Sequence, residues 1–465
     1  MATKLIPLEA FELQLVTSLD DYLARSSAVA SMAALAVKVA GPEWALPDIY
    51  ESETALMSPA QREQVDAAML ALAKALKEAY ESTEQGERDR EIIIARPTDP
   101  HVSDLIDRLI IAHTARVRMP NPGDVLHKSL LILAVSDFEL LIGKVAAAIM
   151  HKVPDAVRGS DATLTLAQLI EIGSVESAVA HIVERRVEEL LRSSVTEWES
   201  WFGKFSIKFR DMIDSWPEFV EIFARRNLAV HNDGIVNRQY LARIAEGGWR
   251  GDCPAIGATL DFDAKYLSSA LDRMATFSIL LTAGAELQIC KKGSDNALHR
   301  LSDKVRELSY SGRHQAVLNV TSTVLRSSRG RMSQQLELGL RIRGWIAMGE
   351  VGRRDAMIAE VESWDVGALA PYYLHVRNVL LQRTEAALSE IREMLKTGAL
   401  SPLRLRLDPL YGELRRDGLL DLVFSEAASA PGADGKDGTD PASTELDQSR
   451  APDVDSSEIF GSEGA

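Results

Sequence analysis

Arg226, Asn227 and His231 lie close together near the middle of the chain, and their types and spacing suit acid–base chemistry on a phosphate. Neutral imidazole, with a pKa of about 6.5, is the usual general base at physiological pH. Arginine stays charged and offers a fork of donors to phosphate oxygens, while the amide can orient the phosphate or hold the histidine tautomer. Such a set suits attack of a ribose 2′-hydroxyl on its own phosphate, which leaves a 2′,3′-cyclic phosphate and a 5′-hydroxyl. This reaction needs no metal or cofactor and spares DNA, which lacks the hydroxyl.

Polar residues beside this trio are candidates for substrate binding: Arg225, Asn232 and Arg238. Two structural alternatives compete with the catalytic interpretation. Glu221 lies four residues before Arg225, which favours an ion pair on the surface of a helix. His231 could also cap a helix C-terminus, where a cation is favoured by about 0.3–1 kcal/mol.

The spacing between Arg226 and His231 predicts a dimer. On a continuous helix, five residues separate two side chains by about 7.5 Å along the axis and about 140° around it. The two side chains of a single copy of the chain then cannot easily reach the same scissile bond, unless the helix ends early, as Gly234 would allow. A two-fold homodimer removes the difficulty by bringing a second arginine–histidine pair alongside.

Apolar periodicity predicts the helices that must position these residues. Helix ends are expected before Pro154 and Gly234, and a helix start is expected at the acidic residues 261 and 263. Four or more antiparallel helices over about 165 residues predict a bundle. The expected helices span 126–150, 174–201, 216–231 and 264–291.

The site segment also resembles a family signature. HEPN-superfamily nucleases carry an arginine, a polar residue and then a histidine, matched here by Arg226, Asn227 and His231. The continuation through 232–237 to Tyr240 resembles a bacterial HEPN subset, in which Val-His-Asn, Gly, Val-Asn and Tyr follow the arginine at these spacings. The resemblance covers about a third of the chain. It implies a helical bundle, a metal-independent endoribonuclease, a composite site at a homodimer interface, and a role in bacterial phage defence or growth arrest.

A second pattern follows the expected bundle. Gly312-Arg313-His314 recurs forty residues later as Gly352-Arg353-Arg354, and 383–386 echoes it again. Small residues recurring at turns resemble tetratricopeptide-like repeats, so stacked helical hairpins are expected, with a surface for RNA, a trigger or a protein partner. The all-α chain is thus divided into a helical N-terminal region of unassigned role, a HEPN-like bundle, helical hairpins and a disordered acidic tail: 1–120, 121–292, 293–426 and 427–465.

Net charge is −16, but it is unevenly spread along the chain. Residues 427–465 hold nine acidic and two basic side chains, whereas 291–356 hold thirteen basic and six acidic ones. The basic block is compatible with a nucleic-acid surface. Its arginines expected to hold RNA or a trigger are Arg326, Arg329, Arg331, Arg341 and Arg343.

Cysteine usage and apolar patterning predict a cytoplasmic protein. Cys253 and Cys290 are far apart and fit neither a disulfide framework nor a metal site. The N-terminal sequence lacks the apolar core of a secretory signal, and the apolar stretch 274–290 contains Glu286 and is too short for a membrane span.

An endoribonuclease is therefore the expected function, and two alternatives remain open. In the first, the bundle serves dimerisation only and the hairpins recruit a protein partner, as helical repeats often do. In the second, the chain is the toxin half of a pair with a nucleotidyltransferase that modifies the site.

Overall fold

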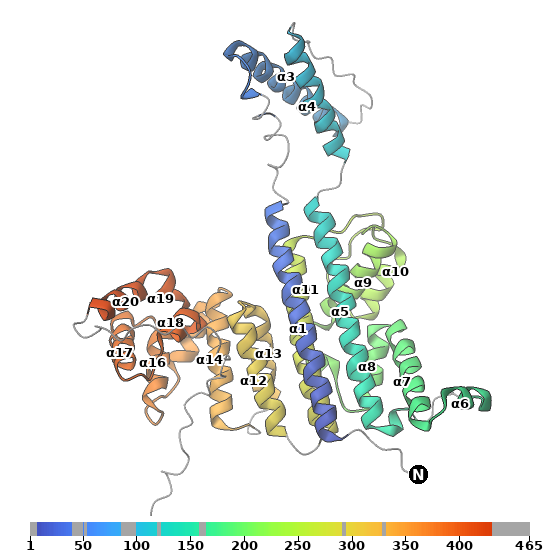
Figure 1. The fold of residues 1–465 in the computed structure, drawn as a ribbon, viewed down its shortest axis with the longest axis vertical. Helices are drawn as coiled ribbons and strands as arrows, with labels where there is room; N and C mark the ends of the chain where they lie inside the picture. Colours follow the sequence, from blue (N-terminus) through green and yellow to red (C-terminus); the bar gives the residue numbers. More distant parts are fainter. Residues whose placement is uncertain are drawn as a thin grey trace, which may run out of the picture.

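The computed structural model describes residues 7–39, 50, 54–84, 99–118, 122–157, 164–290, 294–327 and 332–429 (Figure 1). Every regular element in these ranges is a helix, which confirms the all-α prediction. No single helix in the same ranges is long and apolar enough to cross a membrane, although α6 (Leu166–Ile172) and α7 (Val175–Arg192) pass that test as a pair bent by 109°. An isolated antiparallel β-bridge also joins Ile235 and Thr259, outside any strand.

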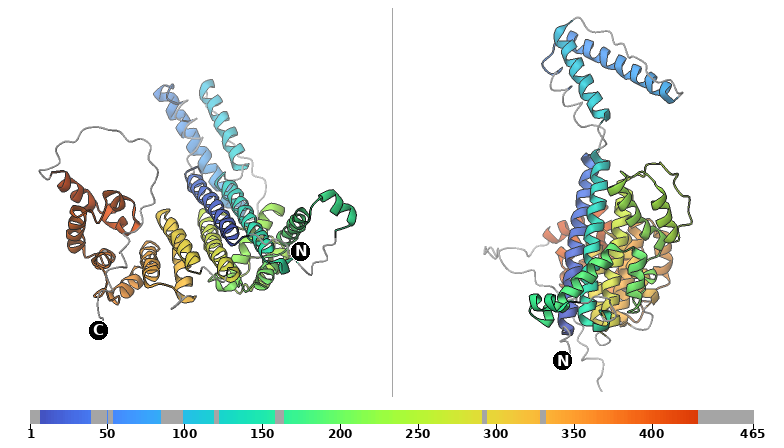
Figure 2. Two further views of the ribbon diagram at one scale, coloured as in Figure 1. Left: turned by 60° about the horizontal axis from the view of Figure 1, so that its bottom comes forward. Right: turned by 90° about the vertical axis from the view of Figure 1, so that its right-hand side faces the viewer.

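Two long antiparallel helices, α1 (Leu8–Val39) and α5 (Pro122–Lys152), form one side of a bundle, and α11 (Ala264–Ile289) packs against both (Figures 1 and 2). Ion pairs between Arg25 and Asp137 (3.0 Å) and between Lys144 and Asp21 (2.9 Å) fix the register of the first two. The packing therefore joins α1, from the N-terminal region of the sequence, to the helices of the expected bundle.

Phe138 on α5 lies at the centre of the bundle and is fully buried. Four rings from three other helices surround it, with centroids 5.6–5.9 Å away: Tyr22, Phe219, Phe223 and Phe277. Aromatic contacts of this kind hold α9 (Trp216–His231), which carries the candidate site, against α5 and α11.

The helices predicted at 126–150, 216–231 and 264–291 are present as α5, α9 and α11, with ends within a few residues of those expected. The prediction of a single helix at 174–201 is wrong, because two helices cover this segment. Ser194 begins a new helix there, because its side chain accepts from the backbone of Glu197 and the Glu197 carboxylate accepts from the backbone of Ser194. The chain accordingly forms α7 (Val175–Arg192) and α8 (Val195–Gly203), preceded by α6 (Leu166–Ile172).

Two helices from the N-terminal region pack on each other in a small core of their own. These are α3 (Pro59–Glu84) and α4 (Pro100–Arg118), drawn beyond the ends of α1 and α5 in Figure 1. A capping box starts α3, since Ser58 N–H donates to Gln61 Oε1 at 3.0 Å and Gln61 N–H donates to the Ser58 hydroxyl oxygen at 3.4 Å.

The remaining chain forms helix pairs, and each pair is joined by the same kind of turn. The backbone N–H of Arg313, Arg353 and Arg383 donates to the carbonyl five residues earlier, at 3.0, 2.8 and 2.9 Å. Gly312 and Gly352 precede two of these arginines with positive φ, and Gln382 does so in the third turn. The recurring Gly-Arg pattern thus marks equivalent turns. The pairs are α12 (Ser294–Tyr310) with α13 (His314–Ser327), α14 (Gln334–Glu350) with α15 (Arg354–Glu362), and α16 (Pro371–Leu380) with α17 (Thr384–Lys396).

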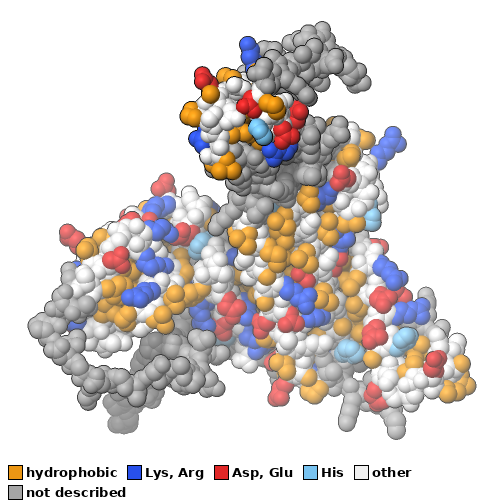
Figure 3. Space-filling view, turned by 45° about the horizontal axis from the view of Figure 1, so that its top comes forward, with side chains coloured by type: hydrophobic (Ala, Val, Ile, Leu, Met, Phe, Trp, Pro, Cys, Tyr) orange, Lys and Arg blue, Asp and Glu red, His pale blue; other side chains and the backbone are white. Residues whose placement is uncertain are grey.

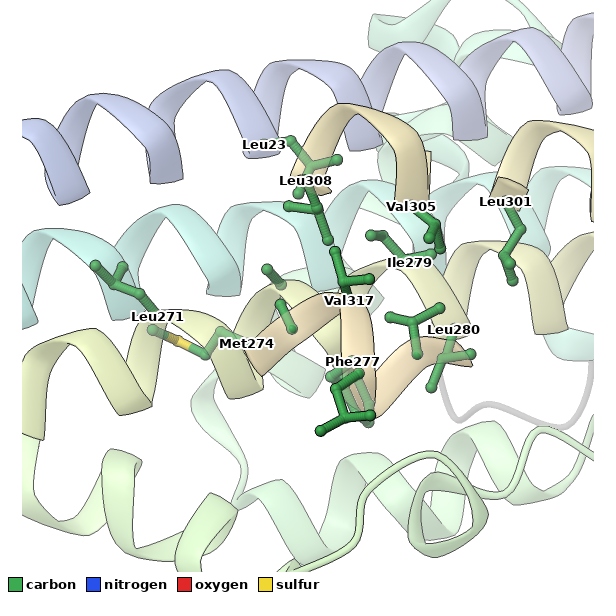
Figure 4. Close-up of a cluster of buried hydrophobic side chains, with 14 of the residues drawn as sticks. Leu23, Leu271, Met274, Phe277, Ile279, Leu280, Leu301, Val305, Leu308 and Val317 are labelled. Carbon is green, nitrogen blue, oxygen red and sulfur yellow. The ribbon is translucent and has the colours of Figure 1, made fainter. Parts of the chain in front are cut away.

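The first pair packs directly on the bundle, so the hairpins share its core. Figure 4 shows Leu308 of α12 and Val317 of α13 beside Ile279 and Leu280 of α11 and Leu23 of α1. Short helices close the other end: α18 (Pro402–Leu407), α19 (Gly412–Arg416) and α20 (Leu419–Ser429). The last helix runs past the predicted boundary at 426, and the rest of the expected acidic tail, 430–465, lies outside the described residues.

Part of the basic block is used internally. Arg343 is 15% exposed and pairs with the buried Asp408 at 2.8 Å, so it serves packing between α14 and the C-terminal helices. Arg341 pairs with Glu337 and Arg326 with Asp214. The remaining two candidates, at 329 and 331, lie outside the described residues.

His375 gives the hairpins a predictable pH dependence. It is 1% exposed between Glu390 and Tyr411, and burial lowers its pKa although Glu390 opposes the shift. The unfolded chain therefore binds the proton more readily, and stability should fall as pH drops through about 6.5. We expect the urea midpoint to decrease between pH 7.5 and 5.5, and His375→Gln to reduce this slope. The exposed His299→Gln control should retain it; equal slopes in all three proteins would contradict the assignment.

Candidate functional site

Helix α9 presents the three predicted catalytic residues in its last two turns. Ser215 and Pro217 start the helix, and buried apolar side chains hold it against the bundle. It stays helical through His231 and then reverses, since the N–H groups of Asn232 and Gly234 both donate to Leu228 O at 2.9 and 3.1 Å. The predicted helix end at Gly234 is confirmed by its φ of 81°.

Arg226 is held in place by two acceptors. Its Nη1 donates to Asn227 Oδ1 at 3.0 Å, and its Nη2 forms an ion pair with Glu139 on α5. The side chains of Arg226 and Glu139 are 17% and 27% exposed. Burial raises the pKa of Glu139, while the positive charge of Arg226 opposes that shift. The guanidinium is thus oriented at the surface of the bundle with part of its charge balanced.

His231 has a different environment. It is the last residue of α9, is exposed, and makes no side-chain hydrogen bond or ion pair within the described part of the chain. Because α9 is continuous, His231 leaves the helix about 140° around from Arg226. The structure therefore brings Arg226 and Asn227 together and leaves His231 on another side of the same helix.

Arg225, predicted to bind substrate, belongs to a network around Glu221. Arg225 donates to Glu221 Oε1 at 2.6 Å and to Asp261 O at 2.8 Å, and its guanidinium lies 3.8 Å from the Tyr266 ring centroid. Glu221 is only 4% exposed and also accepts from the hydroxyls of Tyr240 and Tyr266, at 2.8 and 2.6 Å. The predicted ion pair is therefore present, but it is largely buried and fastens the segment before α11 to α9.

Much of the segment after His231 builds the next turn and helix. Asn232 Nδ2 donates to Ile235 O at 2.5 Å. Asn237 caps α10 (Arg238–Glu246), a helix absent from the sequence prediction, by accepting from Tyr240 N–H at 2.9 Å. Arg238 is exposed in the first turn of α10 and has no hydrogen bond or ion pair among the described residues.

Two site residues were missed by sequence reasoning. Glu139 on α5 is absent from the residues selected above, yet it contacts Arg226. Lys128, two turns from the start of α5, pairs with Asp233 in the turn that follows His231. A charged residue within the apolar stripe of 126–150 was the available signal for Glu139. Its partner could not be identified, because the pairing joins positions 87 residues apart.

No family model, curated protein or solved structure matches this chain. The residues of the site and their geometry are therefore the basis for a functional proposal. Among the described residues there is no cluster of three or more His, Cys, Asp or Glu side chains arranged to bind a metal ion.

A substitution at Gly234 tests how much the turn after His231 contributes to stability. A Cβ at this position would lie 2.7 Å from Phe262 Cε2, on a backbone that L-residues avoid. We expect Gly234→Ala to cost at least about 1–2 kcal/mol from the left-handed conformation alone. Gly257→Ala is the matched control, because its φ is 88° and nothing lies within 4 Å of the added atom. Thermal unfolding should show the larger loss at 234; equal losses would exclude a contribution from the Phe262 contact.

Proposed function

We propose that this protein is a metal-independent endoribonuclease. His231 takes the proton from a ribose 2′-hydroxyl, and the 2′-oxygen forms a bond to the adjacent phosphorus. The bond from phosphorus to the 5′-oxygen breaks, and that oxygen takes a proton from solvent. Arg226 stabilises the charge that develops on the phosphoryl oxygens. The products are a 2′,3′-cyclic phosphate and a 5′-hydroxyl.

The observation that carries this proposal is the contrast between the two residues. Arg226 is oriented by Asn227 and Glu139, as a phosphate-binding cation must be, whereas His231 is exposed and has no partner within the described chain. An exposed imidazole without a partner is free to accept a proton from a bound substrate, as a general base must. The resemblance of the 226–240 segment to HEPN nucleases supports the same reaction and, as part of the proposal, a homodimer active in phage defence or growth arrest.

The test is cleavage of total RNA and tRNA by the purified full chain in EDTA, with analysis of the product ends. Cyclic phosphates and 5′-hydroxyls are expected, and DNA of the same sequence should stay intact. A requirement for a divalent metal, or equal cleavage of DNA, would contradict the proposal.

A second candidate is a non-catalytic adaptor. One observation favours it: Glu139 already balances the charge of Arg226, as in a structural ion pair. In this case the bundle serves dimerisation, and the hairpins, which resemble tetratricopeptide-like repeats, recruit a protein partner. Absence of cleavage under all conditions, combined with a stable protein complex that tolerates His231→Ala, would favour the adaptor.

A further inference from the structure

Helix α6 stands clear of the rest of the protein (Figures 1 and 2). None of its residues is buried, and it meets α7 at a bend of 109°. Hydrophobic side chains are visible on this projection at the lower right of Figure 3. Apolar surface concentrated in this way typically marks a contact with another molecule. Four large apolar residues of the elbow between α6 and α7 are 40–74% exposed, and we refer to them as the α6 patch: Leu166, Leu169, Ile170 and Val175.

The apolar side chains of α6 lie on one side of the helix. Leu166, Leu169 and Ile170 have the i, i+3, i+4 spacing, which places them within about 100° of arc. Gln168 and Glu171 project from the opposite side, about 150° from the middle of that arc. Helix α6 is therefore amphipathic, and its apolar side is left uncovered by the described part of the chain.

Local hydrogen bonds define both ends of α6. The Thr165 hydroxyl oxygen accepts from Gln168 N–H at 3.3 Å, and Gln168 Oε1 accepts from Thr165 N–H at 2.9 Å. At the other end Gly173, with a φ of 81°, donates its N–H to Leu169 O at 3.1 Å. The interior of a bilayer offers no hydrogen-bond partners to backbone groups, so these bonds lower the cost of moving the helix ends out of water.

The composition of the elbow favours a lipid surface over a protein groove. Together α6 and α7 are long and apolar enough for a membrane segment, although only as a bent pair. The side chains of Thr165 and Gln168 bond to each other, so they contribute little to the polar rim that surrounds a typical protein interface. Helix α7 packs against α5, so only the elbow is free to enter a bilayer; the buried residues of α7 are Ala178, Val183 and Leu190.

The charge of the elbow selects the kind of lipid surface. Glu171 and Glu176 are the charged side chains between residues 164 and 180, and both are exposed. Clusters of lysine and arginine attract anionic headgroups, whereas carboxylates are repelled by them. A bilayer whose headgroups carry no net charge therefore fits the α6 patch best.

We propose that the α6 patch inserts into the interfacial layer of such a bilayer. Helix α6 lies in the plane of the membrane, with Leu166, Leu169 and Ile170 toward the acyl chains and Glu171 toward water. Amphipathic helices bind in this way with their apolar side about 5–10 Å into the boundary between headgroups and acyl chains. Val175, in the first turn of α7, enters beside them. Membrane binding by the α6 patch does not depend on the proposed nuclease function.

The test is co-flotation of the purified full chain with phosphatidylcholine vesicles. The wild type should float with the vesicles, and Ile170→Asp should bind at least about tenfold more weakly, because the burial of an isoleucine is lost and a charge is added. Two controls should bind like the wild type: Ile170→Leu, which keeps an apolar side chain, and Leu403→Asp, at a similarly exposed position (65%) on α18. Absence of wild-type flotation, or equal flotation of Ile170→Asp, would overturn the proposal.

Lipid charge and salt distinguish apolar insertion from electrostatic attraction. Replacing half of the phosphatidylcholine by phosphatidylglycerol should weaken binding, whereas added salt should not weaken binding to phosphatidylcholine alone. Binding that anionic lipid strengthens, or that salt abolishes, would contradict insertion of the α6 patch. Self-association of the wild type that Ile170→Asp abolishes, without flotation, would assign the α6 patch to a protein contact and overturn the lipid assignment.

Discussion

His231→Ala should lower RNA cleavage by about 10²–10⁴-fold, the usual contribution of a general base. The expected loss is large because no other imidazole lies on α9 to accept the 2′-hydroxyl proton. Stability should be unchanged, since the side chain is exposed and makes no contact that the described structure relies on. Single-turnover cleavage and the thermal unfolding midpoint measure the two effects separately.

The control for this variant is His299→Ala, which removes an exposed histidine from α12. It should cleave RNA at the wild-type rate. Loss of activity in both variants, or in neither, would exclude His231 as the base. Recovery of the wild-type rate for His231→Ala at high pH would also exclude it, because hydroxide replaces a missing base only inefficiently.

Asp408→Ala should cost about 3–5 kcal/mol, the loss typical of breaking a buried ion pair. Asp408 is 1% exposed and accepts from Arg343 at 2.8 Å and from the backbone of Leu410 at 3.1 Å, with Arg404 3.6 Å away. Its removal leaves the largely buried Arg343 without a carboxylate. Urea unfolding of the full chain, followed by hydrogen exchange over 294–429, measures the loss.

The control variant is Asp417→Ala, an exposed carboxylate of the same segment, which should unfold like the wild type. The effect should also depend on pH. Burial alone would raise the pKa of Asp408, but the charge and hydrogen bonds of Arg343 outweigh it and lower the pKa below its ordinary value. The carboxylate therefore stabilises the folded state above about pH 3.9 and loses this contribution as pH falls through its folded pKa. The difference in unfolding free energy between wild type and Asp408→Asn should therefore shrink as the pH falls. A difference that grows on acidification would contradict the lowered pKa of Asp408.

Local signals in the sequence predicted most helix ends correctly. Two such signals are Asp263 before α11 and Gly234 after α9. They act through a hydrogen bond or a backbone angle within a few residues, so the sequence alone reveals them. The break at Ser194 has the same kind of signal, a capping box with Glu197, and could have been found. The turn glycines at 312 and 352 likewise revealed where the helix pairs turn.

The site was predicted less completely than the helices around it. Arg226, Asn227 and His231 could be selected by residue type and spacing, and the i to i+4 pairing of Arg225 with Glu221 followed from helix geometry. Whether that pair was exposed or buried depended on Tyr240 and Tyr266, which reach Glu221 from two other helices. Burial changes the role of the pair from solvated surface charge to a fastening between α9, α10 and α11.

The sequence by itself determined an all-helical chain, the helix that carries the candidate site and the turns between the C-terminal helix pairs, because each depends on interactions within about five residues. Only the tertiary structure decided that α1 packs along α5 and that Glu139 orients Arg226. These features join positions about ninety or more residues apart, and their energies come from burial and charge pairing between helices. No local pattern encodes which helices will meet.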